Sequence, residues 1–595
     1  MASVSNPFVD YLNRYTTASP DHEAAFDEFL SQIAPPSGQP LHLPTQVENF
    51  LNVSFAQPDP PSVILTGNAG DGKTYLCRQI INATTKQPLH DWERLQHEPI
   101  MLNGKRLYVI KDLSELGDAQ GTALLHRVAA TLSGESEERY LIAANEGRLR
   151  ALAGNDVTLA PLYNLIHDQL TLGEANGARV LVINLTKVTT SSFVRKTLEW
   201  MTAPVHWQAC DGCESRAACP LAYNARQLSQ KPIADRVQML YQLLEHLEIH
   251  VTMRDMLIHL AYTLTANQRC QHLQHMHVAH RDLSALVYYE NIWGHNGHPD
   301  FRRKASVVQH LERLHIGNHS LFELDNFIVS GGESAEEQEQ HQRLFPSDVD
   351  LNQRRFEQER RAYIEGGAET GAQQETPMLA WLPHCRRKLF FEWHANPQVN
   401  RLIPFLFLAD YLDLLENEQR HKESIRRDLV LGLNRAFSRL YLNERDNLYI
   451  TSQYLHSTEQ PRPLVRLTIP IQGIDLRVDR RRHAAYNYDR ADLALVIAPP
   501  PALTMHAGVP PKPESWRMNL LLFEYLMRLA HGGTFNILAE ECELSVRSLK
   551  DRLLRAFVSE TAATDRMVEF FVAEQRRYAL RKLSIDEQGT IRASF

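Results

Sequence analysis

The stretch GNAGDGKT at residues 67–74 constrains the fold of this chain more than any other, because it matches the pattern G-x-x-x-x-G-K-[ST] in full. The apolar run SVIL precedes it, and the helical pattern KTYLCRQII follows. Glycines allow the backbone to turn so that consecutive N–H groups and the start of the next helix face one anion. The lysine adds a positive charge, and the threonine hydroxyl is a Mg²⁺ ligand in this pattern. The sequence therefore predicts a strand, a phosphate loop and a helix that bind ATP or GTP. The residues expected to contact the nucleotide are Gly67, Asn68, Ala69, Gly70, Asp71, Gly72, Lys73, Thr74 and Tyr75.

Short apolar runs alternate with longer helical stretches between residues 62 and 190, as in SVILTG, RLYVIKD, RYLIAAN and RVLVINL. This alternation is typical of an α/β domain with a parallel sheet and crossover helices. Apolar residues then recur with the helical period of 3.6 residues. A chain of 595 residues is too long for one hydrophobic core. The expected segments are an N-terminal helical preamble (1–60), a P-loop α/β ATPase core (61–200), a cysteine-cluster insertion with a helical lid (201–330), a polar linker (331–376), a mixed helical/β domain (377–514) and a winged-helix-like domain (515–595). The alternative for the polar linker is a solvated, partly helical excursion.

The overall charge does not indicate a protein that coats nucleic acid, because the formal net charge is −8. Any DNA contact has to come from a local basic patch. The N-terminus lacks the basic and apolar segments of a secretory signal, and the longest apolar run, LIPFLFLA from Leu402, is far too short to span a membrane. We therefore expect a cytoplasmic protein without a membrane contact.

Two carboxylates follow the apolar run in LYVIKDLSEL. Asp112, at the end of the expected strand, is a candidate Mg²⁺ ligand, and Glu115 is a candidate for polarising the attacking water. Their spacing departs from the usual adjacent Asp-Glu pair. The alternative for Asp112 is a carboxylate that only caps the next turn.

The next run, RYLIAANEGRLR, ends in Asn145 and Glu146. This order of motifs resembles AAA+ ATPases, in which a polar residue at this strand end orients the water and senses the γ-phosphate; Asn145 occupies that place. Glu146 is a rival catalytic carboxylate, and a turn asparagine with a solvated glutamate is the alternative.

The AAA+ resemblance also implies two arginines. Arg179, just before VLVINL, would be a finger that reaches the nucleotide of a neighbouring subunit, unless it is only a surface arginine at a strand start. Arg254 would be a phosphate-sensing residue in the first turn of a lid helix capped by Thr252.

Three cysteines, Cys210, Cys213 and Cys219, lie within ten residues as C-x-x-C-x₅-C-P. A C-x-x-C turn suits a tetrahedral thiolate site, and structural zinc takes four ligands. The fourth ligand is either Cys270 or His206; Cys270 is preferred because the metal would then join the insertion to the end of the lid. An iron–sulfur cluster and free thiols are the alternatives. Since no obvious base for a zinc-bound water lies nearby, we expect a structural site.

The C-terminal stretch FEYLMRLAHGGTFNILAEECELSVRSLKDRLLRAF has the spacing of a helix-turn-helix, with a glycine turn and a last helix capped by Ser545. FFVAEQRRYALRKLSI would supply a wing strand. A packed bundle with a solvated basic face and a protein-docking winged helix are the alternatives. The basic residues of the last helix, which would face phosphates if they share one side, are Arg547, Lys550, Arg552 and Arg555.

Together, the phosphate loop, VIKDLSEL, AANEGRL, the cysteine cluster, TMRDML, GLNRAF and FEYLMRLAHG resemble the P-loop ATPase subunit of bacterial DNA phosphorothioation-dependent restriction systems (DptF-like). The resemblance spans most of the chain. It implies an ATP- and Mg²⁺-dependent subunit of an anti-phage defence system that works with partner subunits on DNA lacking a protective backbone modification. Homo-oligomerisation is compatible with this role. The residues contain no D…(E/D)-x-K nuclease pattern on recognisable strands, so strand cleavage would belong to a partner.

Two other functions stay open. One is a signalling switch in which nucleotide binding drives oligomerisation and hydrolysis resets it. The other is a DNA-binding regulator whose winged helix recognises an operator and whose P-loop is slow; it would bind one duplex with high sequence preference and a strong salt dependence.

Overall fold

The computed structural model divides into two units, each described by itself: the described residues of unit 1 lie within 1–404, and those of unit 2 lie within 405–595. No helix among the described residues combines the length and apolar character that a membrane crossing requires. Residues 16–33 of the expected N-terminal helical preamble lie outside the described residues. The structure describes residues 5–15, 34–86, 98–134, 136–172, 178–278, 282–295, 299–346, 349–365, 377–417, 419–452, 464–480, 491–500, 512–534, 540–557, 567–575, 577–585 and 588–594.

Unit 1 contains a five-stranded sheet in the order β2-β3-β4-β1-β5. Its four long strands are parallel and match the predicted apolar runs. β2, which the apolar runs do not predict, is a short strand antiparallel to β3 at the edge. Thr66 of β1 is level with Ala144 of β4 and Asn184 of β5, so three neighbouring strands end together. The bounds are β1 Ser62–Thr66, β2 Ile100–Leu102, β3 Lys105–Ile110, β4 Glu138–Ala144 and β5 Val180–Asn184.

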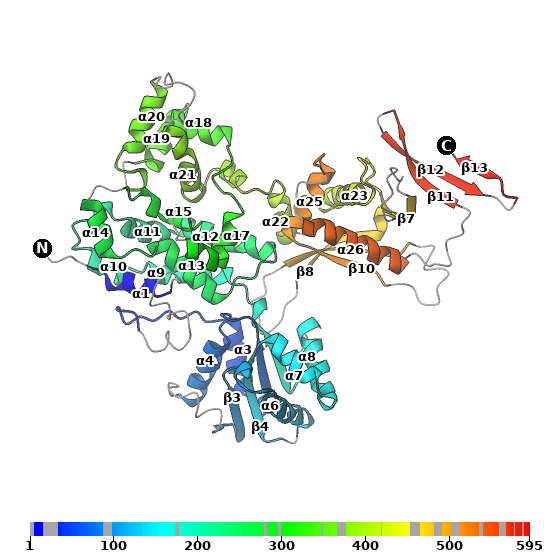
Figure 1. Cartoon of the computed structure of the whole chain (residues 1–595), viewed down its shortest axis with the longest axis horizontal. Coiled ribbons are helices and arrows are strands. Elements are labelled where there is room, and N and C mark those ends of the chain that lie inside the picture. The colour runs from blue at the N-terminus through cyan, green and yellow to red at the C-terminus, as the bar shows by residue number, and fades with distance from the viewer. Residues whose placement is uncertain are drawn as a thin grey trace. The chain divides into compact units, whose positions relative to one another are not determined.

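Helices cover both faces of this sheet (Figure 1). α3 and α4 pack on one face through a buried cluster that includes Leu51 and Ile80. α6, α7 and α8 pack on the other face through a cluster that includes Leu125 and Ile166. The α/β class with a parallel sheet is therefore confirmed. The bounds are α3 Gln46–Phe55, α4 Lys73–Thr85, α6 Asp118–Ala130, α7 Glu146–Gly154 and α8 Ala160–Leu172.

The rest of the described part of unit 1 is helical, as the apolar periodicity predicts for residues 191–330. A buried ionic cluster stabilises this part: the Lys388 ammonium bonds the Asp350 carboxylate and lies 2.9 Å from Glu392. The bounds are α1 Pro7–Asn13, α9 Ser191–Met201, α10 Pro204–Trp207, α11 Pro220–Leu228, α12 Lys231–His246, α13 Met253–Thr265, α14 Cys270–Val278, α15 Tyr288–Asn291, α16 Pro299–Lys304, α17 Ser306–Glu312, α18 Phe322–Ser330, α19 Ala335–Leu344, α20 Arg355–Ile364 and α21 Pro377–Glu392.

The polar stretch at 331–365 carries two helices of unit 1, α19 and α20, so the partly helical alternative fits it better than a plain linker. α19 begins with a capping box at Ser334 and ends with the buried Leu344. Phe356 of α20 is only 1 % exposed. One buried apolar side chain anchors each helix, Leu344 in α19 and Phe356 in α20, so a polar average composition is compatible with two packed helices. Residues 366–376 lie outside the described chain.

Unit 2 contains two antiparallel sheets, β10-β9-β8 and β13-β12-β11-β7-β6. The second sheet pairs β11 with β7 through Glu569 and Val465, so it joins the expected mixed domain to the expected C-terminal domain. A boundary at residue 515 would cut through this sheet. Such a non-local pairing is not visible in the local pattern of either strand. The bounds are β6 Asn447–Thr451, β7 Leu464–Pro470, β8 Ile474–Arg480, β9 Ala491–Ile497, β10 Glu514–Met518, β11 Met567–Glu574, β12 Arg577–Ile585 and β13 Ile591–Ser594.

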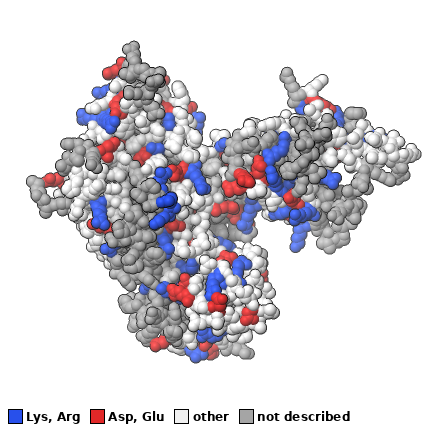
Figure 2. All heavy atoms as spheres, viewed as in Figure 1, with Lys and Arg blue, Asp and Glu red and all other residues white. Residues whose placement is uncertain are grey.

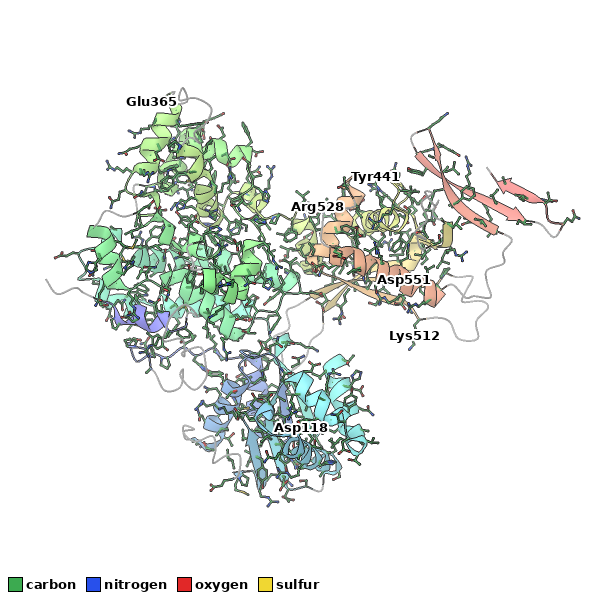
Figure 3. All side chains as sticks on the ribbon, in the orientation of Figure 1. Asp118, Glu365, Tyr441, Lys512, Arg528 and Asp551 are labelled. Atoms are coloured by element: carbon green, nitrogen blue, oxygen red, sulfur yellow. The ribbon has the colours of Figure 1, made fainter. Side chains whose placement is uncertain are left out.

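Helices of unit 2 pack closely around a buried charge. Glu524 is fully buried and accepts hydrogen bonds from the backbone N–H groups of Leu406 and Phe407 and from Arg528, which Figure 3 labels. A Cβ at Gly432 would lie 2.3 Å from the Leu526 carbonyl oxygen, so α23 and α25 can approach only because residue 432 is glycine. The bounds are α22 Leu408–Glu416, α23 Lys422–Ser438, α25 Leu520–Ala530 and α26 Glu540–Phe557.

The last helix differs from the predicted helix-turn-helix. α26 is a single helix that already begins at Glu540, so Ser545 lies inside it and is not its cap. The Ser545 hydroxyl instead accepts a hydrogen bond from Trp516 Nε1 at 3.3 Å. The serine-capped helix start is therefore wrong, because the acidic residues before Ser545 continue the helix.

Candidate nucleotide-binding site

The phosphate loop connects β1 to α4 with the backbone geometry that its glycines allow. Gly67, Gly70 and Gly72 have φ angles of 148°, 99° and 87°, a region that favours glycine. Gly72 precedes α4 and has no side chain to cap the helix. The Lys73 ammonium lies within the loop and donates to the carbonyl oxygens of Gly67 at 2.9 Å and Asn68 at 2.8 Å. Loop and lysine together form the cradle that a chain of phosphates requires.

Lys73 shares its surroundings with three other charged groups. Burial lowers the pKa of Lys73 from its ordinary value, the carboxylates of Asp71 and Asp112 oppose this shift, and Arg254 adds to it. Asp112 follows β3 and caps the next turn, since its Oδ1 accepts from the Ser114 N–H at 2.8 Å. Asp112 therefore caps the turn after β3 and also lies close enough to Lys73 to affect its pKa.

Asn145 stands at the carboxyl end of β4, directly beside the end of β1. Its side chain caps α7, with Oδ1 accepting from the Gly147 N–H at 2.9 Å. The pairing of Thr66 with Ala144 places Asn145 next to the first residue of the phosphate loop. In a parallel sheet, ligands bind beyond the carboxyl ends of the strands. The position of Asn145 is therefore compatible with contact to a bound phosphate.

Two candidate catalytic carboxylates form ion pairs on the surface. Glu146 lies 2.9 Å from Arg150, and its side chain is 40 % exposed. Glu115 lies 3.7 Å from Lys111, and its side chain is 51 % exposed. Since exposed pairs of this kind contribute little stability, either carboxylate is available for another contact.

The N-terminus of α13 packs directly against the phosphate loop. The Arg254 N–H donates to the Gly70 carbonyl oxygen at 3.2 Å. A Cβ at Gly70 would lie 2.9 Å from Arg254 Cβ and 2.9 Å from Thr252 Oγ1. The predicted cap at Thr252 is present, because its hydroxyl accepts from the Asp255 N–H at 3.1 Å. The structure thus brings Arg254 to the loop, where burial lowers the pKa of its half-buried guanidinium.

His250 is a residue of the site that the sequence pattern does not identify. Its Nε2 donates to Asp71 Oδ1 at 2.7 Å, while Asp71 Oδ2 accepts from the Asn68 N–H at 2.6 Å. The Asp71 side chain is 2 % exposed. Asp71 occupies an unspecified position of the phosphate-loop pattern, so only its partner reveals its structural role. The sole sequence signal for His250 is its place two residues before the cap of α13.

Arg179 lies at the opposite end of the sheet from the phosphate loop. Its carbonyl oxygen accepts from the N–H of Ser62, the first residue of β1, whereas the loop follows the last residue. Five strand residues separate the two places by roughly 16 Å. The Arg179 guanidinium lies 3.8 Å from Asp59. Arg179 therefore does not join the site of its own chain, and a role at a neighbouring subunit stays a prediction.

The four cysteines proposed as metal ligands line one small cavity between α11, α14 and the chain before α1. Burial raises the pKa values of Cys210, Cys219 and Cys270 above the ordinary thiol value, that of Cys219 to about 11. In the described part of the chain, no group of three or more His, Cys, Asp or Glu side chains is arranged to hold a metal ion. His206 does not line the cavity; its ring stacks on Phe8 with a centroid separation of 3.9 Å.

The basic residues of α26 do not form one exposed face. Lys550 is 8 % exposed and donates to the Ser452 carbonyl oxygen at 3.4 Å, and Arg552 lies 3.6 Å from Glu514. Arg547 and Arg555 are exposed, and Arg547 lies 3.5 Å from Glu543. Acidic and basic side chains are interspersed on the face of unit 2 that Figure 2 shows. This arrangement weakens the expectation of a phosphate-binding helix face.

The carboxyl edge of the sheet therefore gathers a lysine within a glycine-rich loop, a strand-end aspartate, a strand-end asparagine and an arginine from the start of α13. Such a set can hold a triphosphate, bind a hard divalent cation through oxygen atoms and stabilise negative charge on the terminal phosphate. Compared with protein-family models, curated proteins and solved structures, the chain matches none.

Proposed function

We propose that this chain is a Mg²⁺-dependent ATPase with an AAA+-like core. The position of Lys73 supports this proposal most strongly: its ammonium lies inside a loop with three glycines of positive φ, at the carboxyl end of β1, between β4 and β5. Ligands of open parallel sheets bind beyond this edge. The strands that precede Asp112 and Asn145 lie on the same side of β1, and the order of their motifs along the chain resembles that of AAA+ ATPases.

Each residue of the site would have a separate role in phosphoryl transfer. Lys73 and the loop N–H groups would bind the β- and γ-phosphates, and Arg254 would contact the terminal phosphate from the lid. Thr74 and Asp112 supply the hydroxyl and carboxylate oxygens that suit Mg²⁺, whose chemistry here is to neutralise phosphate charge. Asn145 would orient the attacking water. Stabilising the charge that develops in the transition state is the main catalytic contribution of such groups.

The biological role rests on the resemblance to DptF-like subunits. We propose that hydrolysis serves an anti-phage restriction system in the cytoplasm, in which partner subunits and this chain recognise or process unmodified DNA. Lys550 and Arg552 of α26 already contact the Ser452 carbonyl oxygen and the Glu514 carboxylate. These contacts argue against α26 as a helix that reads an operator sequence. The signalling switch remains the second candidate, because contact between α13 and the phosphate loop offers a direct route from nucleotide to helical lid.

The deciding experiment measures ATP hydrolysis by the wild type and Lys73→Ala without DNA, with phosphorothioated DNA and with unmodified DNA. Lys73→Ala is expected to lower kcat by about 100-fold or more, because it removes a preorganised charge at the phosphates. Lys105→Ala is the matched control, since Lys105 begins β3 at the opposite end of the sheet and pairs with Glu137 at 3.1 Å. Equal rates for Lys73→Ala and wild type contradict the site. Rates indifferent to DNA contradict the restriction role and favour the switch.

A further inference from the structure

Four thiols from two segments of the chain, residues 210–219 and Cys270, line one cavity in unit 1. Cys210 and Cys213 lie in the turns after α10, Cys219 precedes the first residue of α11, and Cys270 is the first residue of α14. The cavity has a volume of about 30 Å³. This is room for a single ion or water, whereas organic ligands need at least several hundred Å³.

The lining defines the chemistry of the occupant. Apart from the thiols, its described polar residues are Asn6, Ser215, Arg216 and Gln274. No carboxylate is among the described residues that line it, so the oxygen ligands typical of Ca²⁺ or Mg²⁺ are not supplied. Four cysteine thiolates in tetrahedral arrangement are a standard ligand set of structural zinc.

N–H groups point at the sulfur atoms, as in the outer shell of a thiolate centre. The Asn6 side-chain amide donates to Cys210 Sγ at 3.4 Å, and the Asn6 backbone N–H donates to Cys270 Sγ at 3.5 Å. Asn6 itself is 2 % exposed. The Gln274 amide lies 3.9 Å from Cys213 Sγ. Donors of this kind stabilise thiolate charge and orient the ligands.

The surroundings of His206 favour Cys270 over it as the fourth ligand, because His206 does not line the cavity. Its ring is 3.9 Å from the Phe8 ring with 5° between the planes, and the Trp200 ring lies at its edge at 5.3 Å. Its main-chain oxygen, rather than the ring, faces the site region, where it accepts from the Asn6 amide at 3.0 Å. The imidazole therefore belongs to an aromatic cluster, which favours Cys270 as the fourth donor.

The four thiols line one cavity but do not stand as a metal-holding group. We propose that Cys210, Cys213, Cys219 and Cys270 move together to close on one structural Zn²⁺ ion, with Asn6 as the residue that ties the chain before α1 to two of the sulfurs. Binding converts the thiols to thiolates and releases their protons. Because all four positions are occupied by protein, no open position remains for a water, and the site stabilises the packing of α1, α11 and α14. The proposal is independent of nucleotide hydrolysis.

The test begins with the full chain purified under reducing conditions, its zinc content measured by inductively coupled plasma mass spectrometry. One Zn²⁺ per chain is expected. Co²⁺ is then substituted, and its absorption spectrum distinguishes four thiolates from three thiolates and an imidazole. A zinc-free wild type that also fails to take up added Zn²⁺ or Co²⁺ overturns the proposal, as does a spectrum with an imidazole ligand.

Variants assign the donors. Cys270→Ser is expected to abolish stoichiometric zinc, and Asn6→Ala to weaken zinc affinity by about 10- to 100-fold in a chelator competition. His206→Gln and Cys542→Ala are the controls and are expected to retain one zinc; Cys542 is a buried cysteine of unit 2. Zinc loss in His206→Gln with retention in Cys270→Ser reverses the assignment. If Asn6→Ala binds zinc with unchanged affinity, the hydrogen bonds from Asn6 to the sulfur atoms do not support the metal site.

Discussion

His250 Nε2 donates a hydrogen bond to Asp71 Oδ1 at 2.7 Å, so a residue just before the lid helix holds a carboxylate of the phosphate loop. Because Asp71 also accepts from the Asn68 N–H, this contact fixes both the loop and the approach of α13. The two segments are separated by 179 positions in the chain. Loop geometry is therefore maintained partly from outside the loop.

His250→Ala is expected to raise the KM for ATP by about tenfold, with a smaller change in kcat, because a hydrogen bond to a buried charged group is lost. Steady-state hydrolysis and nucleotide titration measure the two effects. His126→Ala removes a comparable bond, 2.8 Å to Asp156, on the surface of the same domain. That control is expected to keep the wild-type KM; equal effects of both variants would sink the specific role of His250.

Gly70→Ala is expected to abolish ATP binding and destabilise unit 1, because the new Cβ would lie 2.9 Å from Arg254 Cβ at a backbone φ of 99°. Backbone strain alone costs about 1–3 kcal/mol. Gly104→Ala is the control for strain: its φ is 82°, and no atom lies within 4 Å of the added Cβ. Isothermal titration calorimetry measures the ATP affinity of both variants, and only Gly70→Ala is expected to lose it. Normal ATP affinity in Gly70→Ala contradicts the close approach of α13.

Asp112→Asn is expected to lower kcat by about 100-fold while nucleotide still binds, because a metal-holding carboxylate is lost. Glu115→Gln and Glu146→Gln identify the catalytic carboxylate: the correct one lowers kcat without raising KM. Hydrolysis by single-turnover assay at saturating Mg²⁺ measures each. Full activity in both glutamine variants would show that neither carboxylate polarises the water.

Arg179→Ala is expected to bind ATP normally and to lose hydrolysis only if subunits share their sites. A mixture with Lys73→Ala then regains activity, because some interfaces combine an intact loop with an intact arginine. Arg106→Ala, which removes an arginine 3.5 Å from Glu138, is the control. Wild-type hydrolysis by Arg179→Ala alone would assign Arg179 to the surface contact with Asp59.

Glu290 is expected to make unit 1 acid-sensitive. Burial alone would raise its carboxyl pKa, but hydrogen bonds from His295 and His384 and the charge of Arg387, 2.8 Å away, hold the pKa well below its ordinary value. The folded pKa is thus below the unfolded value of about 4.3, so the stabilisation is present above that pH and is lost as the pH falls below it.

Urea denaturation between pH 7 and pH 3 measures this dependence. Glu290→Gln is expected to lower the free energy of unfolding at pH 7 by about 3–5 kcal/mol, because it leaves Arg387 buried without its partner. The same variant is expected to show a flatter pH profile. Glu323→Gln, which removes an exposed partner of Arg401, is the control. A steep acid loss that persists in Glu290→Gln would assign the sensitivity elsewhere.

The sequence predicts the parallel strands and the phosphate loop because both are local patterns: a continuous apolar run for each buried strand and fixed glycine spacing for the loop. Thr252 was recognisable as a cap for the same reason. His250 and Asn6 were not recognisable, because each acts through a partner far along the chain, Asp71 and the sulfurs of Cys210 and Cys270. Nothing in the residues near them signals that contact.

In the C-terminal part, contacts between distant segments also escape prediction from local sequence patterns. A basic helix followed by strands suggested an independent winged helix, yet β11 completes a sheet with β7, about a hundred positions earlier. Lys550 is buried and donates to the carbonyl oxygen of Ser452, which directly follows β6. Strand pairing and the exposed side of α26 are both set by tertiary packing, which local periodicity does not contain.

The contact between Asn6 and Cys270 spans 264 positions. At translation rates of ~5–20 residues per second, the second partner is made roughly 13–50 seconds after the first. During synthesis the buried apolar face of α1 has to wait for α13, and Phe8 has to wait for its ring partners Trp200 and His206. The first helix of unit 1 to be synthesised therefore completes its packing only after more than two hundred further residues have been made.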